Sequence, residues 1–325
     1  MITAKLERER VMDDVAMRDA YCESLISLAD KDARILAVEA DVMASMGTAA
    51  FAKRFPERSI NCGIQEANAI GVSAALSLMG FIPFFHAFGT FATRRVFDQV
   101  FLSCGYQQAG VKIIGGDAGV AAAANGGTHM PFEDMGLMLL VPGMTVIEPA
   151  DAVAVRSLVP QLAALNGNAY MRSCRHKVIK VYDDSATFEA GKANLLREGS
   201  DVTLVASGIM VHEALCAAEA LESEGVSARV IDHFTVKPLD ERMILECACE
   251  TGAVVTCENH NAAGGLGSAV AALLAGNRPT PMEFIGVHES YGEVGDMAFL
   301  KKRFHLTADD IAAAARRVLQ RKGGK

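Results

Sequence analysis

Short apolar segments alternate with longer helical segments along most of the chain, and this alternation limits the fold more than any other feature. Adjacent parallel strands need a crossover of a dozen or more residues, usually a helix, whereas antiparallel strands need only a tight turn. The pattern therefore predicts mainly parallel sheets with helices on both faces. In the first half the expected strands are 34–41, 59–63, 82–87, 111–116, 144–149 and 169–174, and the expected helices are 64–79, 92–104, 132–140 and 151–164.

A polar, glycine-containing segment at 182–201 interrupts this pattern and is expected to be a linker. We expect two α/β domains, 1–185 and 186–325, each a mainly parallel sheet flanked by helices. The alternation resumes in the second half and closes with the helical stretch ADDIAAAARRVLQRK. The expected strands there are 202–208, 227–236, 253–259 and 282–287, and the expected helices are 211–225, 240–251 and 266–275.

Charge and composition exclude several classes of protein. The net charge of −8 and the scattered Lys and Arg argue against a nucleic-acid-binding surface. The N-terminal stretch MITAKLERERVMDD lacks the apolar core of a signal peptide, and no apolar run reaches the length of about 20 residues that spans a membrane. We therefore expect a cytoplasmic protein with no nucleic-acid or membrane partner. The eight cysteines form no CxxC pair, which favours free, buried thiols over metal ligands or disulfides.

The stretch GIQEANAI, at 63–70, contains an unusual carboxylate. Glu66 is the only formally charged side chain between Ser59 and Thr93. It follows an expected strand and lies in the first turn of the expected helix 64–79, which is apolar on almost every face and should be buried. A carboxylate at this place is either a structural cap that binds backbone N–H groups or a functional acid without a local cation. The pattern alone leaves both interpretations open.

Two further strand-to-helix junctions carry residues that suit a ligand. Phe88 and Phe91 are three residues apart, and such rings are usually core residues, although beside a buried acid they can form a slot for an aromatic ligand. The long small-residue segment 117–134 follows the next strand, and α/β folds place ligands beyond the carboxyl ends of their strands. Within it a Gly-Gly turn presents His129. A lone histidine is often structural, but this position favours a functional one.

These junctions together resemble the pyrimidine-binding domain of transketolases. The resembling stretches are RFPERSINCGIQEANAIGVSAALS, FGTFATRRVFDQ and NGGTHMPFEDMGLMLLVPGMTVIEPAD, in this order. The second half, from GKANLLREGSDVTLVASG to ENHNAAGGLGSAV, resembles the transketolase C-terminal domain, so the resemblance covers nearly the whole chain. It implies a thiamine-diphosphate-dependent transferase that moves a ketol (glycolaldehyde) unit between sugar phosphates.

The resemblance also implies roles for single residues. Glu66 matches a catalytic glutamate that hydrogen-bonds the aminopyrimidine of thiamine diphosphate and favours the tautomer that takes the cofactor's C2 proton; a glutamate able to hold a proton suits this contact. Phe91 matches the ring that stacks on the aminopyrimidine, and Phe88 and Arg94 are expected to belong to the same cofactor site. His129 matches a catalytic histidine that contacts oxygens of the donor sugar.

The substrate-binding residues implied by the resemblance include two departures from the family pattern. Arg18, Ser45 and Arg175 match positions that bind the sugar phosphate, although Arg18 taken alone could equally be a solvated helix position. An aspartate that usually contacts a donor hydroxyl is Asn125 here, and a histidine usually near the acceptor phosphate is Asp117. A carboxylate there repels a phosphate unless an arginine compensates. A branched, shortened or otherwise unusual sugar phosphate therefore stays open as the substrate.

A signature that complete transketolases carry in an earlier domain is missing from this sequence. That domain binds the diphosphate through a metal and contains GDG followed by an Asn; the nearest string here, GGDAGV at 115–120, lies in another junction and lacks the pattern. The chain is thus similar to the second subunit of a split transketolase. We expect an N-terminal partner subunit with the GDG–Asn motif in an α2β2 assembly, thiamine diphosphate and Mg²⁺ held mainly by that partner, and no metal site in this chain.

Three other interpretations deserve comparison. The stretch 258–270, ENHNAAGGLGSAV, could bind a dinucleotide, but it does not fit GxGxxG after a strand, which favours a glycine-rich turn into a helix. The β subunits of 2-oxoacid dehydrogenases share the fold and the glutamate. A non-catalytic regulatory or binding protein that retains the fold is the third alternative.

Overall fold

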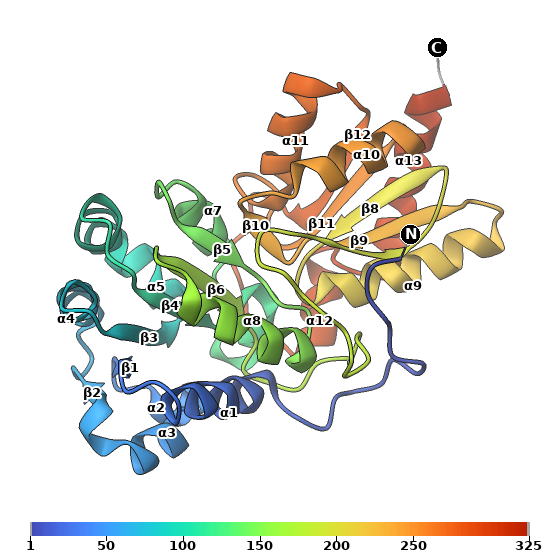
Figure 1. Ribbon diagram of the computed structural model, residues 1–325. Helices are drawn as coiled ribbons and strands as arrows, with labels where there is room; N and C mark the ends of the chain where they lie inside the picture. Colours follow the sequence, from blue (N-terminus) through green and yellow to red (C-terminus); the bar gives the residue numbers. More distant parts are fainter. Residues whose placement is uncertain (1, 324–325) are drawn as a thin grey trace.

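The computed structural model describes residues 2–323 and contains two β-sheets (Figure 1). The strands of the first sheet are β1 (Ile35–Glu39), β2 (Ser59–Asn61), β3 (Ile82–Phe88), β4 (Lys112–Gly116), β5 (Thr145–Ile147), β6 (Ala169–Ser173) and β10 (Thr235–Lys237). The strands of the second sheet are β7 (Asn194–Arg197), β8 (Val202–Ala206), β9 (Ala228–Asp232), β11 (Val254–Asn261) and β12 (Met282–Val287).

Both sheets are mainly parallel, which confirms the fold class predicted from the alternation. Their spatial orders are β10-β5-β6-β4-β3-β1-β2 and β12-β11-β8-β9-β7. The antiparallel pairs lie at the sheet edges, β10 with β5 and β7 with β9. Because β2, β1, β3, β4 and β6 run in the same direction, their carboxyl ends lie along one side of the first sheet.

Helices cover both faces of the first sheet. Helices α1 (Met17–Ala29) and α8 (Ala152–Ala164) pack together on one face, and α4 (Glu66–Leu78) lies on the other with the short helices that follow β3. Successive side chains of a strand point to opposite faces. Phe84 accordingly packs in the cluster with α1 and α8, and Phe85 packs in the cluster with α4. Strands that are apolar at every position thus need a cover on both sides.

The second sheet has the same layered arrangement. Helices α9 (Met210–Ser223) and α13 (Ala308–Gly323) pack on one face, and α10 (Glu241–Thr251) and α11 (Leu266–Asn277) pack on the other. Within residues 2–323 no helix is long and apolar enough to cross a bilayer. The short helical elements are α2 (Met43–Met46), α3 (Ala49–Arg54), η1 (Pro56–Arg58), α5 (Gly89–Ala92), η2 (Arg94–Val96), α6 (Phe97–Gln99), η3 (Val100–Tyr106), η4 (Gly119–Asn125), α7 (Asp134–Leu139) and α12 (Met297–Arg303).

The segment 92–104 does not form the single helix that the sequence pattern predicts. The backbone leaves helical geometry at Thr93, whose φ is −124° and ψ −83°, and the Thr93 hydroxyl donates to the carbonyl oxygen of Gly89 at 2.7 Å. A side-chain bond of this kind to the preceding turn competes with regular helix. The chain continues in η2, α6 and the π-helical η3. The break gives Arg94 and Arg95 different partners.

The expected strand 227–236 is divided between the two sheets. Strand β9 ends at Asp232 in the second sheet, and β10 begins at Thr235 and completes the edge of the first sheet beside β5 (Figure 1). The expected linker 182–201 likewise contains a strand, β7, which pairs with β9. The expected domain boundary after residue 185 stays a prediction.

Helix α4 is covered on one face only, so the prediction that its apolar surface is entirely buried is wrong for this chain by itself. Its other face is open, with Ala67, Ala75 and Leu78 among the exposed residues. Large exposed apolar side chains extend this face before and after α4 and over η3, which contacts α4. They are Ile64, Leu78, Met79, Phe81, Phe101, Leu102 and Tyr106.

A buried arginine joins the two halves of the chain. Arg172 in β6 is fully buried, and its Nε lies 2.9 Å from Oδ2 of Asp134, while its Nη1 pairs with Glu148. Its Nη2 donates to the carbonyl oxygen of Asn259 in β11 at 2.7 Å. The Ser207 hydroxyl, also from the second half, donates to Glu148 at 2.6 Å. These contacts fix the second sheet against the carboxyl ends of β5 and β6.

Candidate active site

The residues selected from the sequence lie mostly where parallel strands of the first sheet end. Phe88 is the last residue of β3, Asp117 directly follows β4, and Arg175 lies two residues beyond β6. Glu66 begins α4, shortly after β2. Strands β6, β4 and β3 are neighbours in the sheet, β2 lies beyond β1, and all of them run in the same direction. Their ends therefore bring together residues that are far apart in the sequence.

Glu66 is buried, and its cation comes from a distant part of the chain. The side chain is 6% exposed, and Nη1 of Arg95 donates to Oε1 of Glu66 at 2.6 Å. The same guanidinium lies over the ring of Phe91, with its Cζ 3.8 Å from the ring centroid. The Arg95 side chain is itself 46% exposed. Glu66 thus has a counter-ion, which the sequence between Ser59 and Thr93 does not contain.

Two phenylalanines and a histidine form an aromatic cluster beside this pair. The ring centroids of Phe88 and Phe91 are 6.0 Å apart, and the His129 ring lies 5.5 Å from Phe88 and 5.0 Å from Phe91. All three contacts are edge-on, and all three rings are partly exposed. The alternative that Phe88 and Phe91 are ordinary core residues is therefore less favourable than an accessible aromatic slot.

Asp117 and Arg175 form a second charged group at the carboxyl ends of β4 and β6. Nε of Arg175 donates to Oδ1 of Asp117 at 2.6 Å, and Nδ2 of Asn125 donates to Oδ2 at 3.0 Å. Asp117 is fully buried and has a positive φ of 61°, a conformation that Asp tolerates better than most residues. The guanidinium of Arg175 also lies 4.9 Å from the ring centroid of Phe88, so this group adjoins the aromatic cluster.

Arg18 and Ser45 meet on the side of α1 and α2. Nη1 of Arg18 donates to the carbonyl oxygen of Ser45 at 3.1 Å. Met46, the residue after Ser45 at the end of α2, packs on β4, because a Cβ at Gly116 would lie 2.6 Å from the sulfur of Met46 and 3.5 Å from Cγ of Arg175. Gly116 thus allows the side chains of Met46 and Arg175 to approach the same strand end.

Arg94, expected in the cofactor site, pairs with Glu133 on the surface: Nη1 of Arg94 lies 2.7 Å from Oε1 of Glu133. The adjacent Arg95 instead contacts Glu66 and Phe91. Sequence reasoning did not select Arg95, because the expected unbroken helix gave no reason to separate the two arginines. The one available signal was Thr93, a β-branched residue that disfavours helix interiors slightly.

The second half of the chain holds the loop that carries Asn125 and His129. Oδ1 of Asn259 accepts from the backbone N–H of Val120 at 2.9 Å, and its Nδ2 donates to the carbonyl oxygen of Ala118 at 2.8 Å. Farther along the loop, a Cβ at Gly127 would collide with the carbonyl of Gly292. The second half therefore fixes the position of the loop although it supplies none of the predicted site residues.

In the glycine-rich stretch 258–270, the carboxylate of Glu258 binds the backbone at the start of the following helix. Oε2 and Oε1 of Glu258 accept from the N–H groups of Leu266 and Gly267, at 2.8 and 2.9 Å, at the start of α11. Burial raises the pKa of Glu258 to about 8. A Cβ at Gly265 would collide with this carboxyl group. The end of α11 that a dinucleotide phosphate would use is thus occupied by Glu258, in agreement with the turn interpretation.

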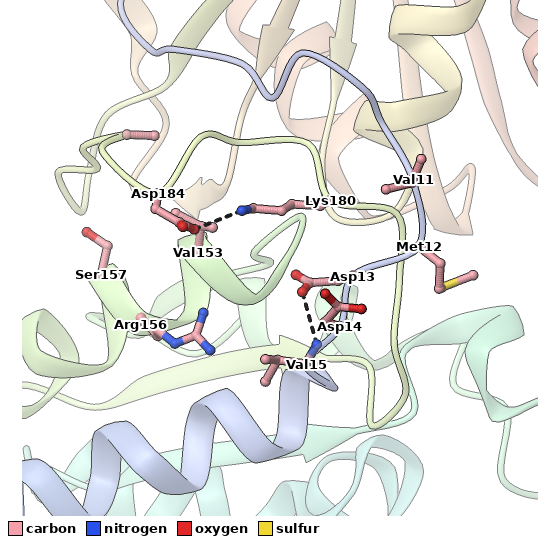
Figure 2. A pocket seen from close by; sticks show the side chains of 11 residues that line it. Val11, Met12, Asp13, Asp14, Val15, Val153, Arg156, Ser157, Lys180 and Asp184 are labelled. Carbon is pink, nitrogen blue, oxygen red and sulfur yellow. Dashed lines mark hydrogen bonds and ion pairs between the residues drawn. The ribbon is translucent and has the colours of Figure 1, made fainter.

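A large surface hollow lies elsewhere. It has a volume of about 700 Å³ and is formed by the N-terminal segment, the start of α8 and residues 180–186, with Asp13, Arg156 and Lys180 on its walls (Figure 2). Figure 2 shows Lys180 paired with Asp184 across it, at 2.9 Å. It shares no lining residue with the strand-end cluster. We favour the strand ends because the buried acid, the aromatic rings and the arginines converge there.

A metal site within the chain would need several ligand side chains close together. Residues 2–323 include no group of three or more His, Cys, Asp or Glu side chains placed to hold a metal ion. All eight cysteines are free, and five of them are buried. The five buried thiols thus belong to packing, whereas Cys62 and Cys216 are partly exposed and Cys249 is exposed.

Two family models divide the chain between them. The transketolase pyrimidine-binding domain matches residues 13–180, and the transketolase C-terminal domain matches residues 191–311. The chain belongs to the transketolase family. Its recognition as the C-terminal part of a transketolase is thereby confirmed, and the gap between the two matches contains the predicted domain boundary without fixing it.

Individual members of the transketolase family match more than nine tenths of the chain. The 6-deoxy-6-sulfo-D-fructose transketolase subunit SqwH of Clostridium sp. (strain MSTE9) is 48% identical over 94% of this chain and 95% of its own length. An apulose-4-phosphate transketolase subunit of Phocaeicola vulgatus is 35% identical over 93% of this chain and 96% of its own length. A split-gene transketolase solved as an inactive β4 tetramer has 42% identity and a TM-score of 0.88, covering 95% of this chain and 100% of that one.

Proposed function

We propose that the chain is the pyrimidine-side subunit of a split, thiamine-diphosphate-dependent transketolase, which transfers a ketol unit between anionic sugars once an N-terminal subunit has joined it. The observation that carries this proposal is the buried Glu66 and the accessible Phe91, which share Arg95 as a contact at the strand ends of the first sheet. Membership of a transferase family and full-length similarity to split transketolase subunits support it.

The residues present fit the aminopyrimidine of thiamine diphosphate. The Arg95 guanidinium is a planar group that donates an N–H to Glu66 and lies on the face of Phe91. A planar aminopyrimidine needs the same two contacts, an N–H···O bond to a carboxylate and stacking on a ring. The Arg95 guanidinium thus occupies the place of the aminopyrimidine ring, and because its side chain is half-exposed it can move away when the cofactor binds. When bound, the cofactor supplies the electron sink for carbon–carbon bond cleavage.

The residues of this chain would bind, orient and exchange protons. Glu66, which is buried, would hydrogen-bond the ring nitrogen of the aminopyrimidine and exchange a proton with it. His129, against both phenylalanine rings, faces the substrate oxygens and can donate or accept a proton there. Phe88 and Phe91 keep water from this region. Arg175 and Arg18 supply N–H donors for the anionic tail of the sugar.

The open apolar face of α4 and η3 supports a partner subunit. Large exposed apolar side chains occur on α4, on the η3 element packed against it and on the flanking residues. Apolar surface of this kind marks protein interfaces. The N-terminal subunit, which would bring the GDG–Asn motif, the diphosphate site and Mg²⁺, is the occupant we assign to it, in an α2β2 complex. The related split-gene β subunit that is inactive as a tetramer by itself agrees with this assignment. A cytoplasmic location stays a prediction.

The proposal is tested by reconstitution. The chain is isolated with its N-terminal subunit, and ketol transfer is measured with thiamine diphosphate and Mg²⁺ for the native complex, Glu66→Gln and Glu57→Gln, the last a change at an exposed glutamate. We expect Glu66→Gln to lower kcat by roughly 10²- to 10⁴-fold, as for removal of an acid–base group, and Glu57→Gln to retain full activity. We expect the chain alone to be inactive.

The outcomes also separate the alternatives. Unchanged turnover in Glu66→Gln would remove Glu66 from the mechanism. Decarboxylation of pyruvate by the complex, without ketol transfer, would instead favour a 2-oxoacid dehydrogenase β subunit. A chain that binds neither thiamine diphosphate nor an N-terminal subunit would favour the non-catalytic interpretation.

A further inference from the structure

The carboxylate of Asp117 has a defined place beside the arginines of the proposed tail-binding site. It is fully buried, directly after β4, and both of its oxygens are occupied: Oδ1 by Nε of Arg175 at 2.6 Å and Oδ2 by Nδ2 of Asn125 at 3.0 Å. A carboxylate held on both sides cannot rotate away when a ligand arrives. Its negative charge is therefore a fixed property of the site.

Arg175 is held by Asp117 in an orientation that leaves donors free. Asp117 takes the Nε–H, and within residues 2–323 the two terminal nitrogens of Arg175 have no hydrogen-bond partner. The guanidinium lies 4.9 Å from the ring centroid of Phe88, at the aromatic cluster. The free N–H groups thus adjoin the slot, where they can bind oxygens of an anion.

A second guanidinium, that of Arg18, approaches this region through α2. Arg18 binds the carbonyl oxygen of Ser45, and the side chain of the next residue, Met46, packs against Gly116, the residue before Asp117. The Arg18 side chain is 35% exposed, so it has room to bind a ligand. Nε of Arg18 lies 3.7 Å from Oδ1 of Asp19, so this guanidinium already has an acidic partner, and the charges of Arg175 and Asp117 cancel in the same way.

We propose that Asp117 makes this site selective for a sugar with a singly charged tail, a sulfonate, over one with a doubly charged phosphate. The inference rests on the proposed ketol transfer. A sulfonate carries one negative charge at neutral pH, whereas a phosphate monoester carries about −1.5 to −2. The site has no surplus positive charge, so the tail binds through the free N–H groups of Arg175 while the carboxylate of Asp117 opposes it. This opposition is stronger for the doubly charged phosphate than for the singly charged sulfonate.

Both kinds of anionic tail occur in the names of similar subunits. The 48% identical relative is named for a sulfonated fructose, and the 35% identical relative for a phosphorylated sugar. The fold and the full-length similarity are compatible with either tail. Asp117, where the family resemblance leads one to expect a histidine, is the feature of this chain that decides between them.

The experiment uses the complex of this chain with its N-terminal subunit, loaded with thiamine diphosphate and Mg²⁺. The donors are 6-deoxy-6-sulfo-D-fructose and D-fructose 6-phosphate, and the acceptor is glycolaldehyde, which carries no charge. The ratio of kcat/KM for the two donors is measured for the native chain and Asp117→Asn, which keeps the shape and an oxygen for Arg175. The matched control is Asp19→Asn, a change at an exposed acid 3.7 Å from Nε of Arg18.

We expect the native chain to prefer the sulfonate and Asp117→Asn to shift the ratio towards the phosphate by about tenfold or more, because removal of one nearby charge acts on the additional phosphate charge. We expect Asp19→Asn to leave the ratio within about twofold, since exposed charges interact weakly. An Asp117→Asn complex that turns over both donors with the native ratio would overturn the inference. So would a native preference for the phosphate, a result that needs no variant.

The same data keep the two proposals apart. Turnover of both donors without a change of ratio contradicts the role of Asp117 and leaves the transketolase function standing. A native, cofactor-loaded complex that transfers a ketol unit from neither donor overturns the proposed function, and the inference with it.

Discussion

Arg95 shows how one side chain can occupy the place of a ligand. It pairs with the buried Glu66 and lies flat on Phe91, so in the free chain these two groups are already engaged. Loss of the first contact leaves the buried Glu66 without a cation, and loss of the second uncovers the face of the Phe91 ring. Binding of a planar cofactor ring must therefore displace the guanidinium, and the apparent affinity includes the free energy of that displacement.

We expect Arg95→Ala to tighten the binding of thiamine diphosphate to the complex. The displaced interaction, a charge-assisted hydrogen bond with a cation–π contact, is worth about 1 kcal/mol at a half-exposed site, so the Kd should fall by roughly fivefold. Titration calorimetry measures this directly. Arg94→Ala is the matched comparison: a loss of affinity there would support the sequence prediction for Arg94, and weaker binding in Arg95→Ala would mean that Arg95 contacts the bound cofactor.

At the scale of elements, the loop between β4 and α7 depends on support from a different sheet. It begins with Asp117 at positive φ, passes through Ala123 at a φ of 45° and reaches His129. Such backbone conformations persist only where surrounding contacts hold them. Asn259, at the carboxyl end of β11, supplies two of these contacts, and the approach of Gly292 to Gly127 supplies another.

We expect Asn259→Ala to lower the free energy of unfolding by about 2 kcal/mol or more, because it leaves the buried N–H of Val120 without an acceptor. The loop that carries Asn125 and His129 should also become less ordered, so kcat/KM of the complex should fall. Urea denaturation and steady-state kinetics measure the two effects. Asn277→Ala removes an exposed bond to Leu273 in α11 and should change neither value. Equal effects of the two variants would contradict this role of Asn259.

At the scale of the whole molecule, the two halves are joined by buried polar contacts. Besides the Arg172 cluster, His260 in β11 bridges to α7: its Nε2 accepts from the backbone N–H of Gly136 at 3.2 Å, and its Nδ1 lies 2.8 Å from the carbonyl oxygen of Asn261. This arrangement requires a neutral ring with the proton on Nδ1. Burial lowers the pKa of His260 to about 4. The join between the halves is therefore sensitive to acid.

We expect the contribution of His260 to stability to decrease as the pH is lowered, and His260→Gln to remove this decrease. Between pH 6.5 and 4 the unfolded chain binds a proton at His260 and the folded chain does not, so the native state loses up to roughly 3 kcal/mol over this range. Glutamine can donate and accept at the same places but does not titrate. Urea denaturation at pH 7.5, 6, 5 and about 4 gives the free energy of unfolding of both proteins. The difference between the native protein and His260→Gln should become smaller as the pH is lowered, and a difference that is the same at every pH would contradict the assignment. His233, whose pKa burial also lowers to about 4, is present in both proteins and cancels.

The sequence by itself determined the class of fold, the family and the positions of Glu66, Phe88, Phe91 and His129 at strand-to-helix junctions. These features follow from local patterns: apolar runs of strand length, helical segments between them and short motifs in order. A local pattern also explains the errors. An apolar helix predicts burial without saying which molecule covers it, and α4 keeps one face open.

Only the tertiary structure decided which charges meet. Arg95 and Glu66 are 29 residues apart, Arg175 and Asp117 are 58 apart, and Asn259 and Val120 are 139 apart. Each pair is set by the order of strands in a sheet, by the break at Thr93 or by the packing of one sheet against the other. Electrostatic and hydrogen-bond energies depend on distance and burial in space, and separation along the chain does not specify either.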